Sequence, residues 1–248
     1  TKAVILANGS ILASAEVVSG EEGGAAARQA VEQALAHVGL RWDDLSYVVA
    51  TGAGRAAVPF ARKQSSEVAC QAKGARHLFP EAGTVINLGA ESSRALRLND
   101  QGKVEGFSTH EKCAAGSGLF LETVARILEV SLEEMGELAL AAPGAEEVAS
   151  HCAVFAESEV ISHVHRGLPK EVILAGVHQA VADRLSEVAQ HVRPRAPVVM
   201  PGRPARNRAL VKEMEKRLGL PVLVPEAPEL VGALGAALVA QEASSATP

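Results

Sequence analysis

The chain has 248 residues and a formal net charge of −5, with 24 basic and 29 acidic side chains. It has no long basic tract, which argues against nucleic acid or an anionic membrane surface as a main partner. It also has no apolar run near the roughly 18 residues that a membrane span requires, and no signal peptide at its start. Its three cysteines, none in an obvious pair, indicate a reducing cytoplasm and not a secreted disulfide framework.

The first elements predict a β-hairpin followed by helices. Residues 1–6 and 11–18 are strand-like and flank Asn8-Gly9, a dipeptide typical of tight hairpin turns. Residues 21–38 carry strong helix formers with small apolar side chains on one face. A strand at 47–50 leads into the glycine-rich turn 51–55, and a helix at 65–78 holds Cys70, which we expect to pack in the core.

The segment from Thr84 to Arg94 predicts a strand followed by an anion-binding turn. Gly89 ends the strand, and a glycine lets the backbone approach a phosphate closely with its amides directed at the anion. Residues 95–98 and 103–108 then form a hairpin around the turn at 99–102.

Two cysteines each stand just before a segment with helical periodicity. Cys113 precedes the run 119–130, and Cys152 precedes the run that begins near Val154. A helix N-terminus stabilises a thiolate, and thiolates bind soft metals. The alternative is that both are small apolar residues of the core, which is the commoner role of a lone cysteine.

Two thiolates do not complete a metal site, because iron–sulfur clusters and structural zinc commonly take four ligands. The simplest completion is a symmetric or pseudo-symmetric dimer in which each chain gives Cys113 and Cys152 to one shared cluster.

The rest of the chain predicts further helices and one more glycine turn. Glu157 and Glu159 lie early in the helix after Cys152, where acidic side chains favour the helix dipole. His163 and His165 are two residues apart and so do not share a helix face, which argues against a histidine metal pair. A long helix at 168–191, a strand and glycine turn at 196–207, and helices at 210–218 and beyond Leu230 complete the prediction.

Three segments, at 112–118, 154–161 and 224–238, together resemble one family, the ATP-dependent activator proteins. Its members are the ATPase subunits of benzoyl-CoA reductase and the activators of 2-hydroxyacyl-CoA dehydratases. The resemblance covers almost the whole chain. It implies an α/β fold of the two-lobed actin, Hsp70 and hexokinase-like (ribonuclease H-like) class. We expect the lobes at about 1–110 and 111–248, with the C-terminal helix crossing back.

The resemblance further implies a dimer bridged by one [4Fe-4S] cluster, with Cys113 and Cys152 as the ligands from each chain. It also implies binding of ATP or ADP with Mg²⁺. On the positions that match the family, the expected nucleotide-binding residues are Lys2, Asn87, Gly89, Ala90, Gly116, Ser117, Gly118, Gly202, Arg203 and Asn207.

The chain departs from the family pattern at three places. Asn87 stands where the family usually has an acidic residue that would hold Mg²⁺ or its waters. Arg203 replaces a glycine of the segment expected to contact adenosine, where it could stack on the purine or block it. Most of the phosphate loop before Lys2 is missing, which predicts an N-terminal truncation.

The loss of the acid at Asn87 favours the less orthodox of two paralogous subunits in a heterodimer. The main expectation is therefore an ATP-hydrolysing electron-transfer subunit that takes electrons from ferredoxin or flavodoxin and drives them into the catalytic core of a benzoyl-CoA reductase. The alternatives are a homodimeric activator of a 2-hydroxyacyl-CoA dehydratase, a sugar or acetate kinase without iron, and a non-catalytic scaffold that has lost nucleotide binding.

Overall fold

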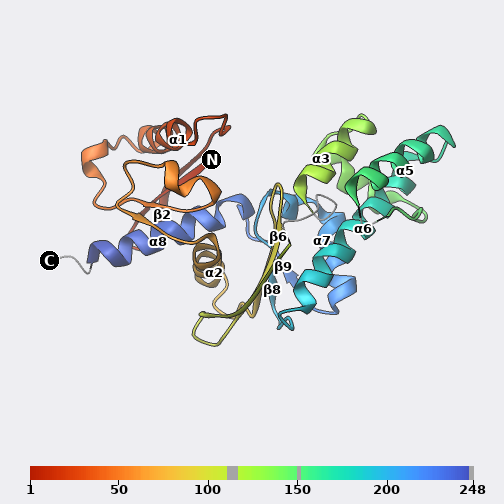
Figure 1. Ribbon diagram of the computed structural model, residues 1–248. Coiled ribbons are helices and arrows are strands. Elements are labelled where there is room, and N and C mark those ends of the chain that lie inside the picture. The colour runs from red at the N-terminus through yellow and green to blue at the C-terminus, as the bar shows by residue number, and fades with distance from the viewer. Residues whose placement is uncertain (111–116, 150–151, 246–248) are drawn as a thin grey trace. The chain divides into compact units, whose positions relative to one another are not determined.

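The computed structural model describes residues 1–110, 117–149 and 152–245 and divides into two compact units (Figure 1). One unit comprises Thr1–Pro80 with Glu229–Pro248, and the other comprises Glu81–Pro228. The division of the lobes near residue 110 stays a prediction. Within the described residues, no helix has the length and apolar character needed to cross a membrane.

The first unit begins with the predicted hairpin. Strands β1 (Lys2–Ala7) and β2 (Ser10–Glu16) pair antiparallel, with Lys2 opposite Glu16. Both turn residues are left-handed, with φ of 50° at Asn8 and 79° at Gly9. Two such residues give the turn a twist that matches the strands, which is why an Asn-Gly pair closes the hairpin here.

Helices and several short elements complete this unit. Helix α1 (Gly23–His37) buries Ala26, Ala30 and Ala34 and packs on both strands of the hairpin. Strands β3 (Val49–Ala50) and β4 (Lys63–Gln64) pair in parallel, so the expected strand at 47–50 is shorter than predicted. The 3₁₀ turns η1 (Trp42–Asp44) and η2 (Ala53–Ala57) lie in the connections before β3 and between β3 and β4.

Helices α2 (Glu67–Leu78) and α8 (Val231–Ser245) approach each other through glycines. A Cβ added at Gly235 would lie 1.8 Å from the backbone oxygen of Cys70, and one at Gly74 would lie 2.1 Å from that of Val231. Only glycine permits this spacing. Cys70 is a fully buried free thiol in this contact, so its predicted role in core packing is confirmed.

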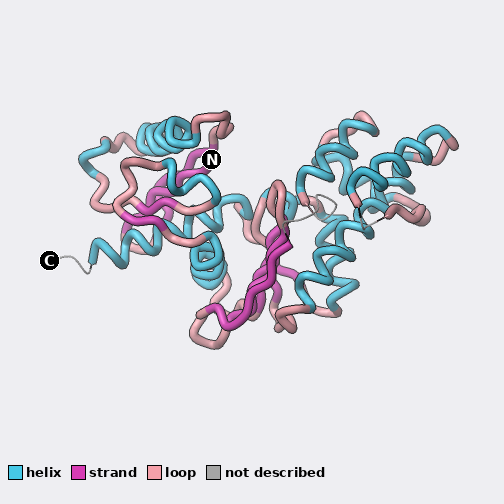
Figure 2. The backbone as a smooth tube through the Cα atoms, viewed as in Figure 1, coloured by secondary structure: helices cyan, strands magenta, loops and turns pink. Residues whose placement is uncertain are grey.

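The second unit contains a five-stranded sheet (Figure 2). Its strands are β5 (Thr84–Leu88), β6 (Ser93–Leu98), β7 (Val104–His110), β8 (Val198–Val199) and β9 (Val222–Leu223), in the order β7-β6-β5-β8-β9. The pairs β5–β6 and β6–β7 are antiparallel, and β5–β8 and β8–β9 are parallel. Strand β5 is central and buried along its whole length, and besides the apolar Val85, Ile86 and Leu88 it buries the polar Thr84 and Asn87.

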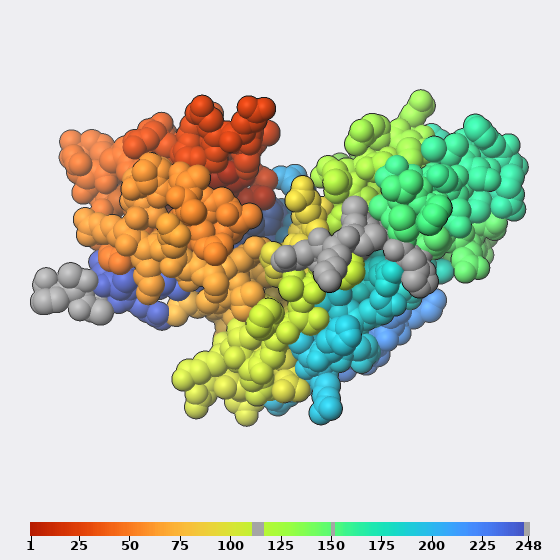
Figure 3. Space-filling model, viewed as in Figure 1, coloured from red at the N-terminus to blue at the C-terminus, as the bar shows by residue number. Residues whose placement is uncertain are grey.

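The helices of this unit are α3 (Gly118–Ile127), α4 (Leu132–Ala141), α5 (Ala153–His165), α6 (Lys170–Gln190) and α7 (Arg208–Leu218). Helix α6 packs on β5, β6 and β7, and α4, α5 and α7 pack on α6. The predicted stripe of α6 is buried, including Ile173, Val177, Val181 and Leu185. In the space-filling view (Figure 3) the outer side chains of α3 and α5 form a continuous green surface.

Candidate functional site

Three turns that the sequence singles out meet in the second unit. They are the end of β5 with the loop after it, the start of α3, and the turn at Gly202 that precedes α7. Asn87, Gly118 and Gly202 each lie within a few ångströms of the Gly89 loop or of one another. Of the expected nucleotide-binding residues, this group brings together Asn87, Gly89, Ala90, Ser117, Gly118 and Gly202.

The start of α3 is joined to the Gly89 loop by backbone hydrogen bonds. The amide of Gly118 donates to the oxygen of Gly89 at 2.8 Å, and that of Leu119 donates to the oxygen of Ala90 at 2.9 Å. A Cβ at Gly118 would lie 3.2 Å from the Gly89 oxygen, so a glycine is needed for this approach. Ser117, the N-cap residue, is fully buried beside the contact. These two helix amides are therefore occupied by protein carbonyls.

Asn87 lies against the Gly202 turn. Gly202 has φ of 93°, and a Cβ placed on it would lie 2.7 Å from the side-chain oxygen of Asn87. The amide of Gly202 donates to the oxygen of Pro228 at 2.7 Å, which fixes the turn from its other side. Both the left-handed backbone and the lack of space call for glycine here. Asn87 is 6% exposed, and its side-chain oxygen lies at this junction.

Asn207 ends the same turn, bonds to two helices and lies close to a third. Its side-chain oxygen accepts the amide of Leu210 at 3.2 Å, so Asn207 is the N-cap of α7. Its side-chain nitrogen lies 2.7 Å from Nε2 of His178 on α6. A Cβ at Gly136 of α4 would lie 2.8 Å from the Asn207 side-chain oxygen, so that glycine makes the space.

His178 is a site residue that the sequence analysis missed. It is fully buried, and its Nδ1 lies 2.6 Å from the oxygen of Leu174. A carbonyl only accepts, so Nδ1 carries the proton and Nε2 accepts from the Asn207 amide. Burial lowers the pKa of His178, and the contacts with Leu174, Asn207 and Glu213 oppose that shift. The available signal was a histidine inside the apolar stripe of a long helix, next to Val177.

The other expected nucleotide residues lie elsewhere or outside the description. Lys2 is in the first unit, where it forms an ion pair with Glu16 at 3.4 Å. Arg203 is exposed in the 3₁₀ turn η4 (Arg203–Arg206). Gly116 lies outside the described residues. In the turn 51–55, Arg55 closes the loop on itself by donating to the oxygen of Gly52 at 3.0 Å.

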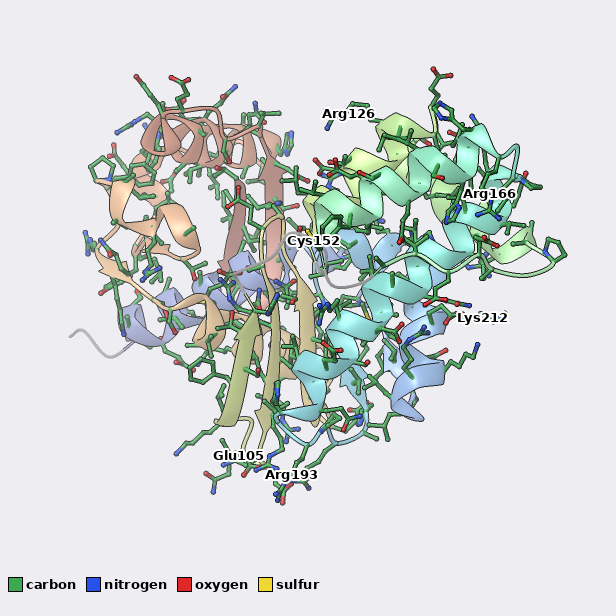
Figure 4. All side chains as sticks on the ribbon, turned by 45° about the vertical axis from the view of Figure 1, so that its right-hand side comes forward. Glu105, Arg126, Cys152, Arg166, Arg193 and Lys212 are labelled. Atoms are coloured by element: carbon green, nitrogen blue, oxygen red, sulfur yellow. The ribbon has the colours of Figure 1, made fainter. Side chains whose placement is uncertain are left out.

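Cys152 is the N-cap residue of α5, with an extended backbone and a partly exposed free thiol. Figure 4 labels it at the start of that helix and Arg166 near its other end. The predicted placement ahead of a helix N-terminus is therefore confirmed for Cys152. Cys113 lies outside the described residues. Within the described part of the chain, no group of three or more histidine, cysteine or acidic side chains could hold a metal, and two thiols per chain would not form such a group.

The two acidic residues of α5 are both partly buried but differ in their contacts. A carboxylate oxygen of Glu159 accepts the backbone amide of Ala149 at 2.6 Å, and no such bond is found for Glu157 among the described residues. Glu159 is thus engaged with the segment before Cys152. The two histidines of this helix also separate, since His163 is buried and His165 is exposed, as their spacing predicts.

Comparison with known proteins adds to this geometry. The sequence profile of the BadF/BadG/BcrA/BcrD ATPase family matches residues 1–240. The activator of lactoyl-CoA dehydratase from Anaerotignum propionicum is 43% identical over 244 residues, which are 98% of this chain and 94% of that protein. A benzoyl-CoA reductase subunit from Thauera aromatica is 36% identical over 219 residues, which are 86% of this chain and 77% of that protein.

Solved structures give the same picture. The activator of the 2-hydroxyisocaproyl-CoA dehydratase from Clostridium difficile, with bound ADPNP, matches with a TM-score of 0.94 at 39% identity, covering 98% of this chain and 91% of that one. A ROK family glucokinase from Streptomyces griseus matches with a TM-score of 0.57 at 15% identity, covering 98% and 96%, and this likeness concerns the fold alone. The predicted actin- and Hsp70-like ATPase fold is therefore confirmed.

The comparisons reverse the order of two expected functions. The dehydratase activator is more similar to this chain, and over more of its length, than the reductase subunit is. The expectation of a benzoyl-CoA reductase subunit rested on the single departure at Asn87. One position weighs less than similarity along nearly the whole chain.

Proposed function

Because this chain belongs to the BadF/BadG/BcrA/BcrD ATPase family, we propose that it is the ATP-hydrolysing activator of a 2-hydroxyacyl-CoA dehydratase. The observation that carries the proposal is the near full-length similarity to two such activators, one of them with bound ADPNP. The meeting of the Asn87, Gly89, Gly118 and Gly202 turns in one place supports a nucleotide site in this chain.

The residues of that meeting point suit a nucleotide. Gly89 and Gly202 let neighbouring protein atoms come close, Ser92 to the first and Asn87 to the second, and glycine turns of this kind are typical of phosphate and adenosine sites. In the proposal, the Gly89–Ala90 loop faces the phosphates, and the Ser117–Gly118 segment holds that loop in place through the hydrogen bonds of α3 to Gly89 and Ala90. The turn from Gly202 to Asn207 faces adenosine, with Arg203 stacking on the purine. Lys2 and Gly116 remain predicted contacts.

Asn87 is proposed to hold Mg²⁺ through water. A neutral amide attracts a hard cation less than a carboxylate does, so we expect the metal to be held mainly by the nucleotide phosphates. Asn87 also lies against Gly202, so its side chain would stand between the loop proposed to face the phosphates and the turn proposed to face adenosine.

The donor set suits a shared iron–sulfur cluster, since such clusters are held by cysteine sulfurs and Cys152 stands at the N-cap position of α5. Cys152 and Cys113 of each chain of a dimer would hold a [4Fe-4S] cluster, which supplies one-electron chemistry at low potential. A ferredoxin or flavodoxin in the cytoplasm is the proposed donor, and the catalytic core of the dehydratase is the proposed acceptor.

A second candidate is supported by Asn87 and by the similarity to the benzoyl-CoA reductase subunit from Thauera aromatica. In that case the chain would pair with a homologous ATPase subunit, and the partner core would reduce an aromatic CoA thioester.

An anaerobic preparation tests the proposal. We expect four irons per dimer and an electron paramagnetic resonance signal on reduction. Two cysteines from each chain supply the four thiolates that one [4Fe-4S] cluster takes, so a dimer holds one cluster. Cys113→Ala and Cys152→Ala should each abolish the signal, whereas Cys70→Ala should keep it because Cys70 is buried in the first unit. Colourless protein from the wild type, or a full signal in either of the first two variants, would contradict the cluster assignment.

Partner assays separate the two functions. The reduced protein with MgATP should activate a 2-hydroxyacyl-CoA dehydratase core and leave a benzoyl-CoA reductase core inactive. The opposite result would favour the second candidate. Failure to bind MgATP in calorimetry would point to a non-catalytic scaffold.

A further inference from the structure

The segment before Cys152 is held along α5 by three side chains of that helix and its C-cap. Glu159, His163 and Arg166 follow one another at spacings of four and three residues, so they lie on one face of the helix. Each contacts the segment 146–149, which runs beside the helix before the chain reaches Cys152.

Each of these side chains contacts a different residue of the segment, with about one contact per turn of the helix. Glu159 accepts the amide of Ala149 at 2.6 Å. Nε2 of His163 lies 3.1 Å from the oxygen of Glu147. Arg166 donates to the carboxylate of Glu146 at 3.1 Å.

The two hydrogen-bond partners of His163 also fix its tautomer. Arg166 Nη1 lies 3.2 Å from Nδ1 of this histidine, and a guanidinium only donates. The oxygen of Glu147 only accepts, so His163 donates through Nε2 and accepts through Nδ1. His163 is buried, and each of its two nitrogens thus has a partner of the correct kind.

Helix α6 supports the segment as well. The amide of Glu146 donates to the oxygen of Val172 at 3.3 Å. A Cβ at Gly176 would lie 1.8 Å from the Glu146 oxygen, so this glycine makes the close approach possible. Val148 is buried in the core of the unit. The segment is therefore held by two helices up to Ala149.

Cys152 is fixed from its C-terminal side by the helix itself, since its oxygen accepts the amide of Ala156 at 2.9 Å. On the N-terminal side, the hydrogen bond between Glu159 and Ala149 is the contact nearest to Cys152 among the described residues. Without it, the nearest remaining anchor on that side in the described part of the chain is the buried Val148. The length of chain free to move before Cys152 would then increase by one residue, or up to about 3.5 Å of reach.

We propose that Glu159 is a positioning residue for Cys152: by holding Ala149 it confines the thiol to the N-terminus of α5, where a cluster ligand must stand. This inference rests on the proposed function, because it concerns Cys152 as a metal ligand. Glu157, on the same helix two residues away and also partly buried, offers a matched control of the same charge.

The first measurement is hydrogen exchange of the Ala149 amide in protein without cluster. A hydrogen bond to a charged group is among the stronger ones, so Glu159→Ala should speed exchange about tenfold or more. Glu159→Gln keeps a side-chain oxygen and should restore most of the protection. Glu157→Ala should leave the exchange rate unchanged. Unchanged exchange in Glu159→Ala would overturn the anchor itself.

The second measurement is the rate of iron loss to a chelator from the anaerobic dimer. Glu159→Ala should lose iron about tenfold faster than Glu157→Ala, with Glu159→Gln close to the wild type. Faster exchange at Ala149 without faster iron loss would show a merely structural contact and overturn the proposal. If Glu159→Ala fails to fold, Arg166→Ala can be used, since it removes the exposed hydrogen bond to Glu146. It should raise both the exchange rate at Ala149 and the rate of iron loss, by a smaller factor. A wild type without iron would refute the proposed function, while the exchange result would still decide the anchor.

Discussion

Replacing His178 by leucine is expected to destabilise the turn that ends at Asn207. The imidazole is fully buried, and its Nε2 accepts the Asn207 amide at 2.7 Å. Leucine fills a similar volume but leaves that amide without its acceptor, and an unsatisfied buried donor costs about 1–3 kcal/mol. We expect a loss of about 2 kcal/mol and a fall in Tm of about 4–8 °C.

The substitution should also weaken nucleotide binding, because the same amide side chain caps α7 and ends the Gly202 turn. Thermal unfolding with and without MgADP, together with calorimetry, measures both effects. His178→Gln places a carbonyl oxygen at the same number of bonds from Cα as Nε2, so it should recover most of the stability. His165→Gln, at an exposed histidine of α5, is the control. Wild-type stability in His178→Leu, or equal losses in the leucine and glutamine variants, would refute the reasoning.

His178 also makes the stability of the protein depend on pH. Burial holds its pKa below the ordinary value of 6.5, so near and below that pH the unfolded chain binds a proton that the folded chain does not. The stability from the neutral imidazole is fully present above about pH 6.5 and is lost as the pH falls, by at most about 1.4 kcal/mol per pH unit. In His178→Leu the unfolding free energy should fall less steeply with acid. An identical pH profile would assign the loss to other groups.

Three further substitutions test the other contacts. Gly202→Ala places a methyl group 2.7 Å from the Asn87 oxygen at a left-handed backbone, so nucleotide affinity and Tm should both fall, by about 1–3 kcal/mol in stability. Asn87→Asp restores a carboxylate and should tighten MgATP binding more than binding of ATP without metal; calorimetry showing equal changes would remove Asn87 from the metal. Gly235→Ala would bring a methyl group 1.8 Å from the Cys70 oxygen and should lower the Tm of the first unit while leaving nucleotide affinity unchanged, as differential scanning calorimetry would show.

The local elements could be predicted because their causes are local. The hairpin follows from the turn at Asn8-Gly9, which needs no distant contact to favour left-handed backbone. The stripe of α6 and the capped start of α4, where the side chains of Ser131 and Glu134 bond each other's backbone amides, follow from spacing along the chain. The glycines at 89 and 202 were also predictable as turns.

The partners of those residues could not be read from the chain. His178 and Asn207 are 29 positions apart, and Glu159 and Ala149 are joined only because the chain doubles back along α5. Glu159 was expected to favour a helix dipole, a role that any exposed acid can have. Its carboxylate instead holds a backbone amide, and no periodicity distinguishes it from Glu157.

The sequence by itself determined the helices and strands, the ATPase family, and the placement of Cys152 ahead of a helix. It did so because turn chemistry, helical spacing and motif order are properties of neighbouring residues. Only the tertiary structure decided that Asn87 lies against Gly202, that Gly118 is joined to Gly89, and that His178 holds Asn207. Those contacts depend on how β5, α3, α6 and α7 pack, and packing is set by the space that distant side chains leave for one another.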